Sequence, residues 1–288
     1  MSMSKKILVL GSSGLIGHQV CNYLKTFDNF IVFDLAHTRK LTKDTILLDI
    51  RDEKKVDELI IRLKPDYIIN CVGILIEGSK KDPASAIFLN AYMPHHLMKI
   101  ADEIKAKLIH ISTDCVFSGK KGQYNEDDEK DGTGIYARTK ALGEIINSKH
   151  LTLRTSVVGP ELKANGEELF HWFMQQKGSV NGFTKSIWSG VTTLELAKAV
   201  KRSIDKNTTG LYHITNGKTI NKFELLNLFK KYSNHQIQII PVDGIVSDKS
   251  FVDSRQEFDN LIPSYEVMVK EMLEFMNKHR NIYSQYIN

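Results

Sequence analysis

The feature that most constrains the fold is the segment KILVLGSSGLIG, residues 6–17. An apolar run (6–11) predicts a buried strand, and an amphipathic stretch (14–27) predicts a helix directly after it. Between them lie glycines in GxxGxxG spacing, which permit a tight turn, close approach of backbone to a diphosphate, and close helix–strand packing. The helix N-terminus adds free N–H groups and partial positive charge. The segment predicts a dinucleotide site; the alternative is a loop that only turns tightly. The expected cofactor contacts here are Gly11, Ser13, Gly14, Leu15, Ile16 and Gly17.

The same alternation continues through the first half of the chain. Short apolar runs predict further strands at 30–35, 45–50, 67–73, 107–113 and 151–159. Amphipathic segments predict helices at 53–65, 83–104 and 136–148. Nearly continuous apolar strands separated by helices are typical of a parallel sheet covered on both faces, with right-handed crossovers. We therefore predict an α/β fold with a doubly wound parallel sheet, a Rossmann fold.

The regular alternation weakens after Gly159. Residues 168–188 read as an irregular stretch, followed by predicted helices at 192–205, 221–233 and 264–280 and a strand and turn at 210–217. We predict a dinucleotide-binding Rossmann domain over 1–159, with return segments near 190–217. Residues 160–288 should form mostly a smaller, C-terminal substrate-binding lobe.

Composition narrows the class of protein. The net charge of +5 over 288 residues is small and scattered, which suits an anionic small molecule better than nucleic acid. The three cysteines, Cys21, Cys71 and Cys115, form no CxxC pair, which argues against a disulfide framework or a zinc site. No stretch approaches the ~20 apolar residues of a membrane helix. We expect a soluble cytoplasmic protein with no metal, no nucleic-acid partner and no membrane association.

A second pattern, YARTK, places Tyr136 and Lys140 on one face of a predicted helix. A tyrosine with a pKa of ~10 is a poor acid–base group at neutral pH. Lowering that pKa by roughly three pH units requires about 4 kcal/mol of preferential stabilisation of the phenolate. The Lys140 ammonium and an oxidised nicotinamide would supply it. A surface pair is the alternative, but the position one strand after Thr113 favours catalysis.

Together the glycine loop, Thr113 at a strand end and YxxxK resemble the extended branch of the short-chain dehydrogenase/reductase superfamily. More narrowly, ISTDCVFSGKKGQYNEDD, YARTKALGE and LRTSVVGP resemble the dTDP-4-dehydrorhamnose reductase family, which reduces 4-keto nucleotide sugars. The similarity runs from about residue 5 to about residue 235 and is densest between 108 and 160.

The resemblance implies a catalytic triad. Thr113 matches the residue that binds the substrate carbonyl, Tyr136 the general acid, and Lys140 the residue that lowers the tyrosine pKa and binds the nicotinamide ribose. Asp114, Cys115, Val116, Phe117 and Trp188 are then candidate substrate contacts. For Trp172 and Trp188 packing in the core is the favoured alternative. Ser112 is expected to bond backbone at the strand end, and Arg154 to have a structural role.

The choice of cofactor stays open between NADP(H) and NAD(H). Asp34 ends the second strand, where a carboxylate binds ribose hydroxyls and favours NAD. Arg39 and Lys40 follow closely and would pair with a 2′-phosphate, which favours NADP. Asp49 and Ile50 are placed near the adenine, with a strand-end cap as the alternative for Asp49.

The fourth predicted strand and the helix after it complete the expected cofactor wall. By analogy with the family, the backbone of Cys71, Val72 and Gly73 would run beneath the cofactor. Asn90 matches the place where short-chain enzymes put an asparagine that supports the catalytic lysine; an ordinary helix residue is the alternative.

The resemblance thus implies an NAD(P)H-dependent reductase of a 4-keto-6-deoxy nucleotide sugar, serving surface-polysaccharide synthesis, with dTDP and UDP both open as the nucleotide. One alternative is an epimerase of the same fold; another is a non-catalytic regulatory dinucleotide-binding subunit. Cys115 stands where a 4,6-dehydratase carries glutamate, which argues against dehydration. A homodimer is expected from family analogy alone.

Overall fold

The computed structural model describes residues 4–258 and 261–286. Two compact units divide the chain. Unit 1 comprises Met1–Val116, Lys130–Arg154 and Ala197–Tyr212. Unit 2 comprises Phe117–Glu129, Thr155–Leu196 and His213–Asn288. Each unit is therefore assembled from segments far apart in the sequence.

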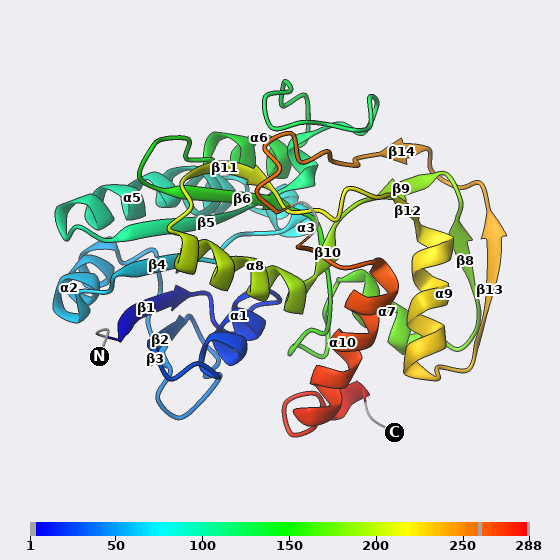
Figure 1. Cartoon of the computed structure of the whole chain (residues 1–288), viewed down its shortest axis with the longest axis horizontal. Helices are drawn as coiled ribbons and strands as arrows, with labels where there is room; N and C mark the ends of the chain where they lie inside the picture. The colour runs from blue at the N-terminus through cyan, green and yellow to red at the C-terminus, as the bar shows by residue number, and fades with distance from the viewer. Residues whose placement is uncertain (1–3, 259–260, 287–288) are drawn as a thin grey trace. The chain divides into compact units, whose positions relative to one another are not determined.

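A seven-stranded sheet forms the centre of unit 1, in the order β11-β6-β5-β4-β1-β2-β3 (Figure 1). Its strands are β1 (Lys5–Leu10), β2 (Phe30–Ala36), β3 (Ile46–Leu47), β4 (Tyr67–Asn70), β5 (Lys107–Thr113), β6 (Leu151–Thr155) and β11 (Gly210–His213). β1 pairs in parallel with both β2 and β4, and β4 pairs in parallel with β5. The chain thus leaves β1 toward one side and later returns to its other side. This confirms the predicted doubly wound Rossmann fold, whose ligand crevice lies at the carboxyl ends of β1 and β4.

Helices cover both faces of this sheet. The bounds are α1 (Gly17–Leu24), α2 (Glu53–Leu63), α3 (Ile76–Lys81), α4 (Pro83–Ala86), α5 (Met93–Glu103), α6 (Ile135–Leu142) and α8 (Thr193–Lys206). Leu8 and Leu10 of β1 join one hydrophobic core with residues of α2 and α5. Ile7 and Val9 alternate to the opposite face and are fully buried as well. Burial on both faces explains why these strands read as continuous apolar runs.

The helix predicted over 83–104 is interrupted. α4 passes into a π-helical segment, Ile87–Tyr92, before α5 begins. Pro94 has no N–H to donate to the carbonyl of Asn90, and its ring would crowd that carbonyl in a regular α-helix. The Asn90 carbonyl instead approaches Gly143, where a Cβ would lie 2.0 Å from it. That close approach coincides with the end of α6 at Leu142, six residues earlier than predicted.

The described residues of unit 2 contain short strand pairs and the α-helices α7 (Leu169–Gln175), α9 (Lys222–Ser233) and α10 (Tyr265–Lys278). β8 (Gly178–Phe183) pairs in parallel with β13 (Ile237–Val242). β9 (Ser186–Trp188) lies between β12 (Ile220–Asn221) and β14 (Ser247–Asp248), and β7 (Val157–Val158) pairs with β10 (Val191–Thr192). The stretch 168–188, predicted to be irregular, therefore contains a helix and two strands. Its aromatic residues build a local core, in which Phe170 and Phe229 meet edge to face.

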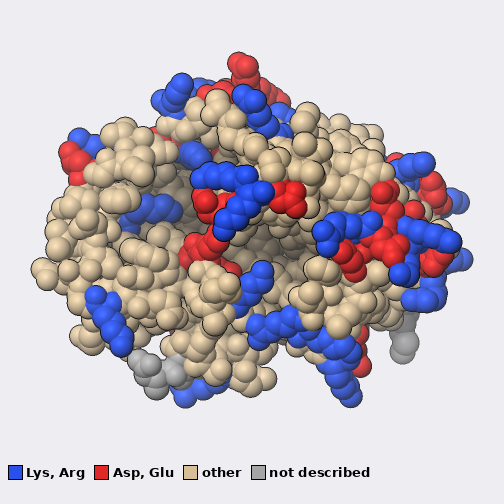
Figure 2. Space-filling model, turned by 180° about the vertical axis from the view of Figure 1, so that it is seen from behind, with Lys and Arg blue, Asp and Glu red and all other residues tan. Residues whose placement is uncertain are grey.

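The surface carries mixed charge. On the face shown in Figure 2, basic and acidic side chains lie next to one another in separate clusters, with uncharged surface between them. None of the described helices is long and apolar enough to span a membrane.

Candidate active site

The glycine loop after β1 is shaped by close backbone packing. Gly11 adopts φ +80°, and its N–H donates to the carbonyl of Leu35 at 2.9 Å. A Cβ on Gly17 would lie 2.1 Å from the oxygen of Gly11, so no other residue fits there without moving the loop. His18 holds the turn through its Nδ1, 2.8 Å from the oxygen of Gly14. The loop is therefore fixed before any ligand binds.

This loop fits a diphosphate. Within residues 4–258 and 261–286, the N–H groups of Ser13, Leu15 and Ile16 have no backbone acceptor. The hydroxyl of Ser12 is buried and lacks a hydrogen-bond partner among the same residues. These donors lie where α1 begins, and a helix N-terminus favours an anion. The residues present thus suit the phosphates of a dinucleotide.

The segment after β4 lies against this loop. A Cβ on Gly11 would lie 3.1 Å from Val72 Cγ2 and 3.2 Å from the Cys71 carbonyl carbon. This adjacency follows from the β1–β4 pairing and puts Cys71 and Val72 beside the glycine loop, while the contact of Cys71, Val72 and Gly73 with a cofactor stays a prediction. Burial raises the pKa of the Cys71 thiol to about 12, and the Lys140 charge opposes this. Cys71 is therefore a neutral thiol that lies within electrostatic reach of Lys140.

Asn90 links this segment to α6. Its Oδ1 accepts from the Ile74 N–H at 2.9 Å, and its Nδ2 donates to the Ile74 carbonyl at 3.0 Å and to Thr139 Oγ1 at 3.3 Å. Its hydrogen bonds thus go to the neighbour of Lys140 on α6 rather than to Lys140. Any support of the lysine by Asn90 is indirect.

The three predicted catalytic residues lie in unit 1, at the end of β5 and on α6. Tyr136 is hydrogen-bonded to Thr113, which lowers the pKa of its phenol, but burial raises that pKa more. Lys140 donates from Nζ to the Ile111 carbonyl at 2.7 Å and lies 3.4 Å from His110 Nε2. The Lys140 ammonium is directed at β5 and not at the phenol in this arrangement, so the lowering of the Tyr136 pKa expected from Lys140 and an oxidised nicotinamide together stays a prediction. Burial lowers the pKa of Lys140 itself to about 8.

The residues after Thr113 form a short 3₁₀ turn, Asp114–Val116. Thr113 Oγ1 donates to Asp114 Oδ1 at 3.1 Å and accepts from the Cys115 N–H at 3.1 Å. Cys115 acts on the pKa of Tyr136 and so lies near the phenol, whereas Val116 is fully buried. The turn therefore holds the Thr113 hydroxyl in place.

The hydrogen bond of Ser112 differs from the backbone contact expected at the strand end. Its hydroxyl donates to Glu144 Oε1 at 2.7 Å, not to backbone. The same carboxylate binds Arg154 twice, Nε to Oε1 at 2.8 Å and Nη2 to Oε2 at 2.7 Å, with both side chains at most 1% exposed. The structural role predicted for Arg154 is confirmed. The partner, Glu144, was missed because nothing in its local sequence pattern marks it as buried.

The acidic residues predicted near the adenosine are both engaged in side-chain contacts. Asp34 is 3% exposed, with Lys25 Nζ at 2.7 Å from Oδ1 and Thr45 Oγ1 donating to Oδ2 at 2.7 Å. Asp49 binds Arg51, which lowers the Asp49 pKa to about 2. Ile50 packs in the hydrophobic core.

The aromatic candidates for the substrate lie in unit 2 and pack within it. Phe117 is 1% exposed and stacks on Tyr124 with ring centroids 4.1 Å apart. Trp188 is 4% exposed and lies 5.7 Å from the Tyr265 ring. Trp172, expected in the core, is instead 39% exposed.

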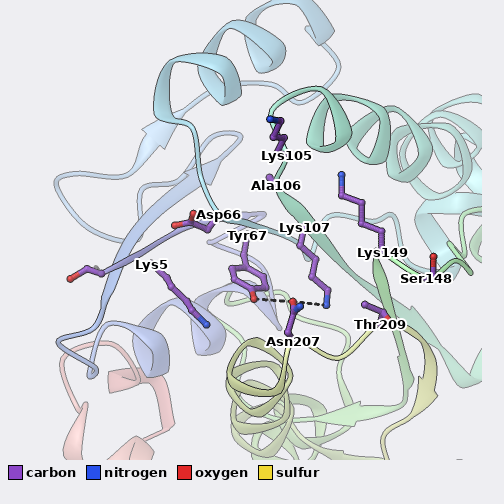
Figure 3. A pocket seen from close by; sticks show the side chains of 11 residues that line it. Lys5, Asp66, Tyr67, Lys105, Ala106, Lys107, Ser148, Lys149, Asn207 and Thr209 are labelled. Atoms are coloured by element: carbon purple, nitrogen blue, oxygen red, sulfur yellow. Dashed lines mark hydrogen bonds between the residues drawn. The ribbon is translucent and has the colours of Figure 1, made fainter. Parts of the chain in front are cut away.

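A pocket of about 520 Å³ lies elsewhere in unit 1, where β1, β4 and β5 begin (Figure 3). Lys5 Nζ donates to the Ile204 carbonyl at 3.2 Å, and Lys107 Nζ donates to Asn207 Oδ1 at 3.1 Å. These lysines face the last turn of α8, whose negative end attracts a cation, although burial and the neighbouring Lys5 disfavour the charge on Lys107. The pocket is thus at the opposite edge of the sheet from the glycine loop, and helix capping accounts for its charges.

Known proteins resemble the chain over nearly its whole length. It is 26% identical to the spore coat polysaccharide biosynthesis protein SpsK of Bacillus subtilis, covering 93% of this chain and 90% of that protein. It is 25% identical to the dTDP-4-dehydrorhamnose reductase of Salmonella typhimurium, covering 94% and 97%. Its fold matches the solved dTDP-4-dehydrorhamnose reductase of Bacillus anthracis in complex with NADP, with a TM-score of 0.81, 21% identity, and 95% and 100% coverage. The family model described as the RmlD substrate binding domain matches residues 5–251, and the chain therefore belongs to that family.

Proposed function

We propose that the protein is an NADPH-dependent reductase of a 4-keto-6-deoxy nucleotide sugar and supplies a precursor of a surface polysaccharide in the cytoplasm. The observation that carries this proposal is the placement of Thr113, Tyr136 and Lys140. One strand end and one helix bring them together in the unit that holds the glycine loop. The relatives named above, including a dTDP-4-dehydrorhamnose reductase, support the choice of substrate.

In this mechanism NADPH supplies the hydride, and the chain supplies position and a proton. The Thr113 hydroxyl would turn its hydrogen from Asp114 Oδ1 to the keto oxygen, while the Cys115 N–H, which donates to the same hydroxyl, keeps its oxygen in place. Tyr136, already hydrogen-bonded to Thr113, delivers its proton to the oxygen as negative charge develops there. Charge is thus neutralised where it forms. Protonated Lys140 would stabilise the resulting phenolate once its Nζ turns from the Ile111 carbonyl toward Tyr136.

The preference for NADPH over NADH rests on side chains at the end of β2. Both carboxylate oxygens of Asp34 already accept hydrogen bonds, from Lys25 and Thr45, which leaves this residue poorly suited to ribose hydroxyls. Arg39 and Lys40 are exposed just beyond the strand and suit a 2′-phosphate. An Arg39→Ala variant should raise KM for NADPH about tenfold and leave KM for NADH nearly unchanged.

The test follows oxidation of NADPH in the presence of dTDP- and UDP-linked 4-keto-6-deoxy sugars. Wild-type protein should turn over at least one of them. Tyr136→Phe should lower kcat by at least a hundredfold while cofactor affinity, measured by fluorescence, stays the same. Turnover of none of these sugars would refute the reductase. Sugar inversion without net NADPH loss would indicate the epimerase, and unchanged activity in Tyr136→Phe would remove Tyr136 as the acid.

The assembly state belongs to the same proposal. We propose a homodimer on superfamily analogy, and light scattering after size exclusion would give about twice the chain mass of 32.8 kDa. A mass of one chain at micromolar concentration would contradict it.

A further inference from the structure

His110 is a buried histidine on β5, three residues before Thr113, and it touches two other polar side chains. It is 0% exposed. Its Nδ1 lies 3.2 Å from Asn70 Nδ2 on the adjacent strand β4, and its Nε2 lies 3.4 Å from Lys140 Nζ on α6. Both neighbours are nitrogens that ordinarily donate. A neutral imidazole accepts at one nitrogen and donates at the other, so the two contacts cannot be alike.

The orientation of Asn70 decides which nitrogen accepts. Its Oδ1 accepts the Val72 backbone N–H at 3.1 Å, so its amide nitrogen must face the histidine. Rotating the amide would place its NH₂ against the Val72 N–H. Asn70 therefore donates to Nδ1 of His110. Burial, with the Lys140 charge next, holds the pKa of His110 well below its ordinary value and keeps the ring neutral. Its single proton is then on Nε2.

The Nε2–H group of His110 consequently faces Lys140. An ammonium has no lone pair and cannot accept this hydrogen, whereas a neutral amine can. The Ile111 carbonyl accepts from the lysine in either state. The other titratable groups around Lys140 are Cys71 after β4, a neutral thiol, and Glu144 beyond α6, whose charge favours the ammonium.

We propose that Asn70 and His110 are positioning residues for Lys140: Asn70 fixes the histidine proton on Nε2, and this N–H favours the neutral amine over the ammonium. The inference rests on the proposed catalytic role of Lys140. Its consequence is that the pair sets the pH above which the lysine stops assisting Tyr136. Proton exchange on Lys140 is with solvent, since one proton is lost or gained and no other group changes state.

The test is a titration of Lys140 followed by NMR in protein labelled with ¹³C at lysine Cε, the signal being assigned by its loss in Lys140→Met. The wild-type midpoint is expected near pH 8, in line with the lowered pKa of this group. His110→Gln can present its side-chain oxygen to the ammonium and should raise the midpoint by at least one pH unit. The alkaline limb of kcat/KM should move by the same amount.

Two controls keep the test decisive. His150→Gln replaces another fully buried histidine, whose ring nitrogens lie near the Leu108 N–H and Asp102, and should not move the Lys140 midpoint. Asn70→Asp draws the histidine proton to Nδ1, frees Nε2 to accept, and should raise the midpoint even if His110→Gln fails to fold.

The outcomes separate this inference from the proposed function. An unchanged or lower midpoint in folded His110→Gln overturns the inference, as does a rise confined to Asn70→Asp, which would be the effect of added charge alone. A raised midpoint in both variants, in a protein that reduces none of the sugars, would support the positioning pair and refute the reductase.

Discussion

Replacing Arg154 by methionine tests how strongly a buried ion pair holds α6 and its catalytic residues to the sheet. The Glu144 carboxylate is 0% exposed and would lose two hydrogen bonds of 2.7–2.8 Å while remaining buried. Removing one partner of such a pair costs about 3–5 kcal/mol, since an uncompensated charge is left behind. Two other partners of the carboxylate remain, Ser112 at 2.7 Å and Lys130 at 3.2 Å. The expected loss of unfolding free energy therefore lies near the lower end of this range.

The assay is chemical unfolding at pH 7, monitored by circular dichroism, with midpoint and slope fitted for each variant. We expect Arg154→Met to lower the unfolding free energy by about 3 kcal/mol. The double variant Glu144→Leu with Arg154→Met should recover most of this loss, because an apolar pair of similar volume is often as stable as the ion pair. A loss below about 1 kcal/mol, or a double variant as unstable as the single one, would refute the reasoning.

Acidification gives an independent check on the same pair. Hydrogen bonds and charge from Arg154, then Ser112 and Lys130, outweigh burial and hold the pKa of Glu144 below its ordinary value of 4.5. The unfolded chain therefore binds the proton more readily, and this stabilisation is complete above pH 4.5 and is lost as pH falls through the lowered folded pKa. In Arg154→Met the buried carboxylate protonates more easily. The cost of the substitution should then shrink toward pH 4, and a constant cost would contradict a charge effect.

Three further predictions follow from the geometry of unit 1. Gly17→Ala places a methyl group 2.1 Å from the Gly11 oxygen and should weaken NADPH binding at least tenfold, whereas Gly134→Ala, with no atom within 4 Å, should bind normally; equal calorimetric affinities would contradict this. Thr113→Val should lower kcat at least tenfold with unchanged NADPH affinity. A change in NADPH affinity without a change in kcat would contradict the role of Thr113 in binding the keto oxygen. Burial, then Lys5, lowers the pKa of Lys107 from 10.5 to about 8, so the folded chain binds fewer protons between these values and stability rises with pH there. Lys107→Met should therefore melt higher than wild type at pH 7 and equally near pH 10.5, and a gain that persists at high pH would exclude the charge as its cause.

The parts predictable from sequence are those set by local pattern. Apolar runs followed by amphipathic segments predicted the parallel, helix-covered sheet of unit 1, because parallel strands buried on both faces must be covered by helices. Glycine spacing located the loop, in which a Cβ on Gly17 would lie 2.1 Å from the Gly11 oxygen and Gly11 itself adopts φ +80°. The YxxxK spacing predicted that Tyr136 and Lys140 share one face of a helix, because residues four apart lie one turn apart.

Contacts between distant segments could not be read from the sequence in this way. The break in the helix at 87–92 depends on how Asn90 meets Gly143, 53 residues later. Glu144 looked like an ordinary helical acid, and only tertiary packing shows it buried. His110 did carry a signal, a polar side chain within the all-buried strand LIHIST, but its role needed Asn70 and Lys140 in space.

The polar residues of β5 explain how a strand can specify the position of a helix. Side chains alternate along a strand, so His110 and Ser112 project to one face. There they meet Lys140 and Glu144, four residues apart at α6 and just beyond it. Shifting α6 by one residue would separate both pairs at once and leave buried donors and acceptors unpaired, at about 1–3 kcal/mol each. An apolar contact would tolerate such a shift. The buried polar pairs therefore fix the register of α6 against β5, and with it the meeting of Tyr136 and Thr113 on which proton transfer depends.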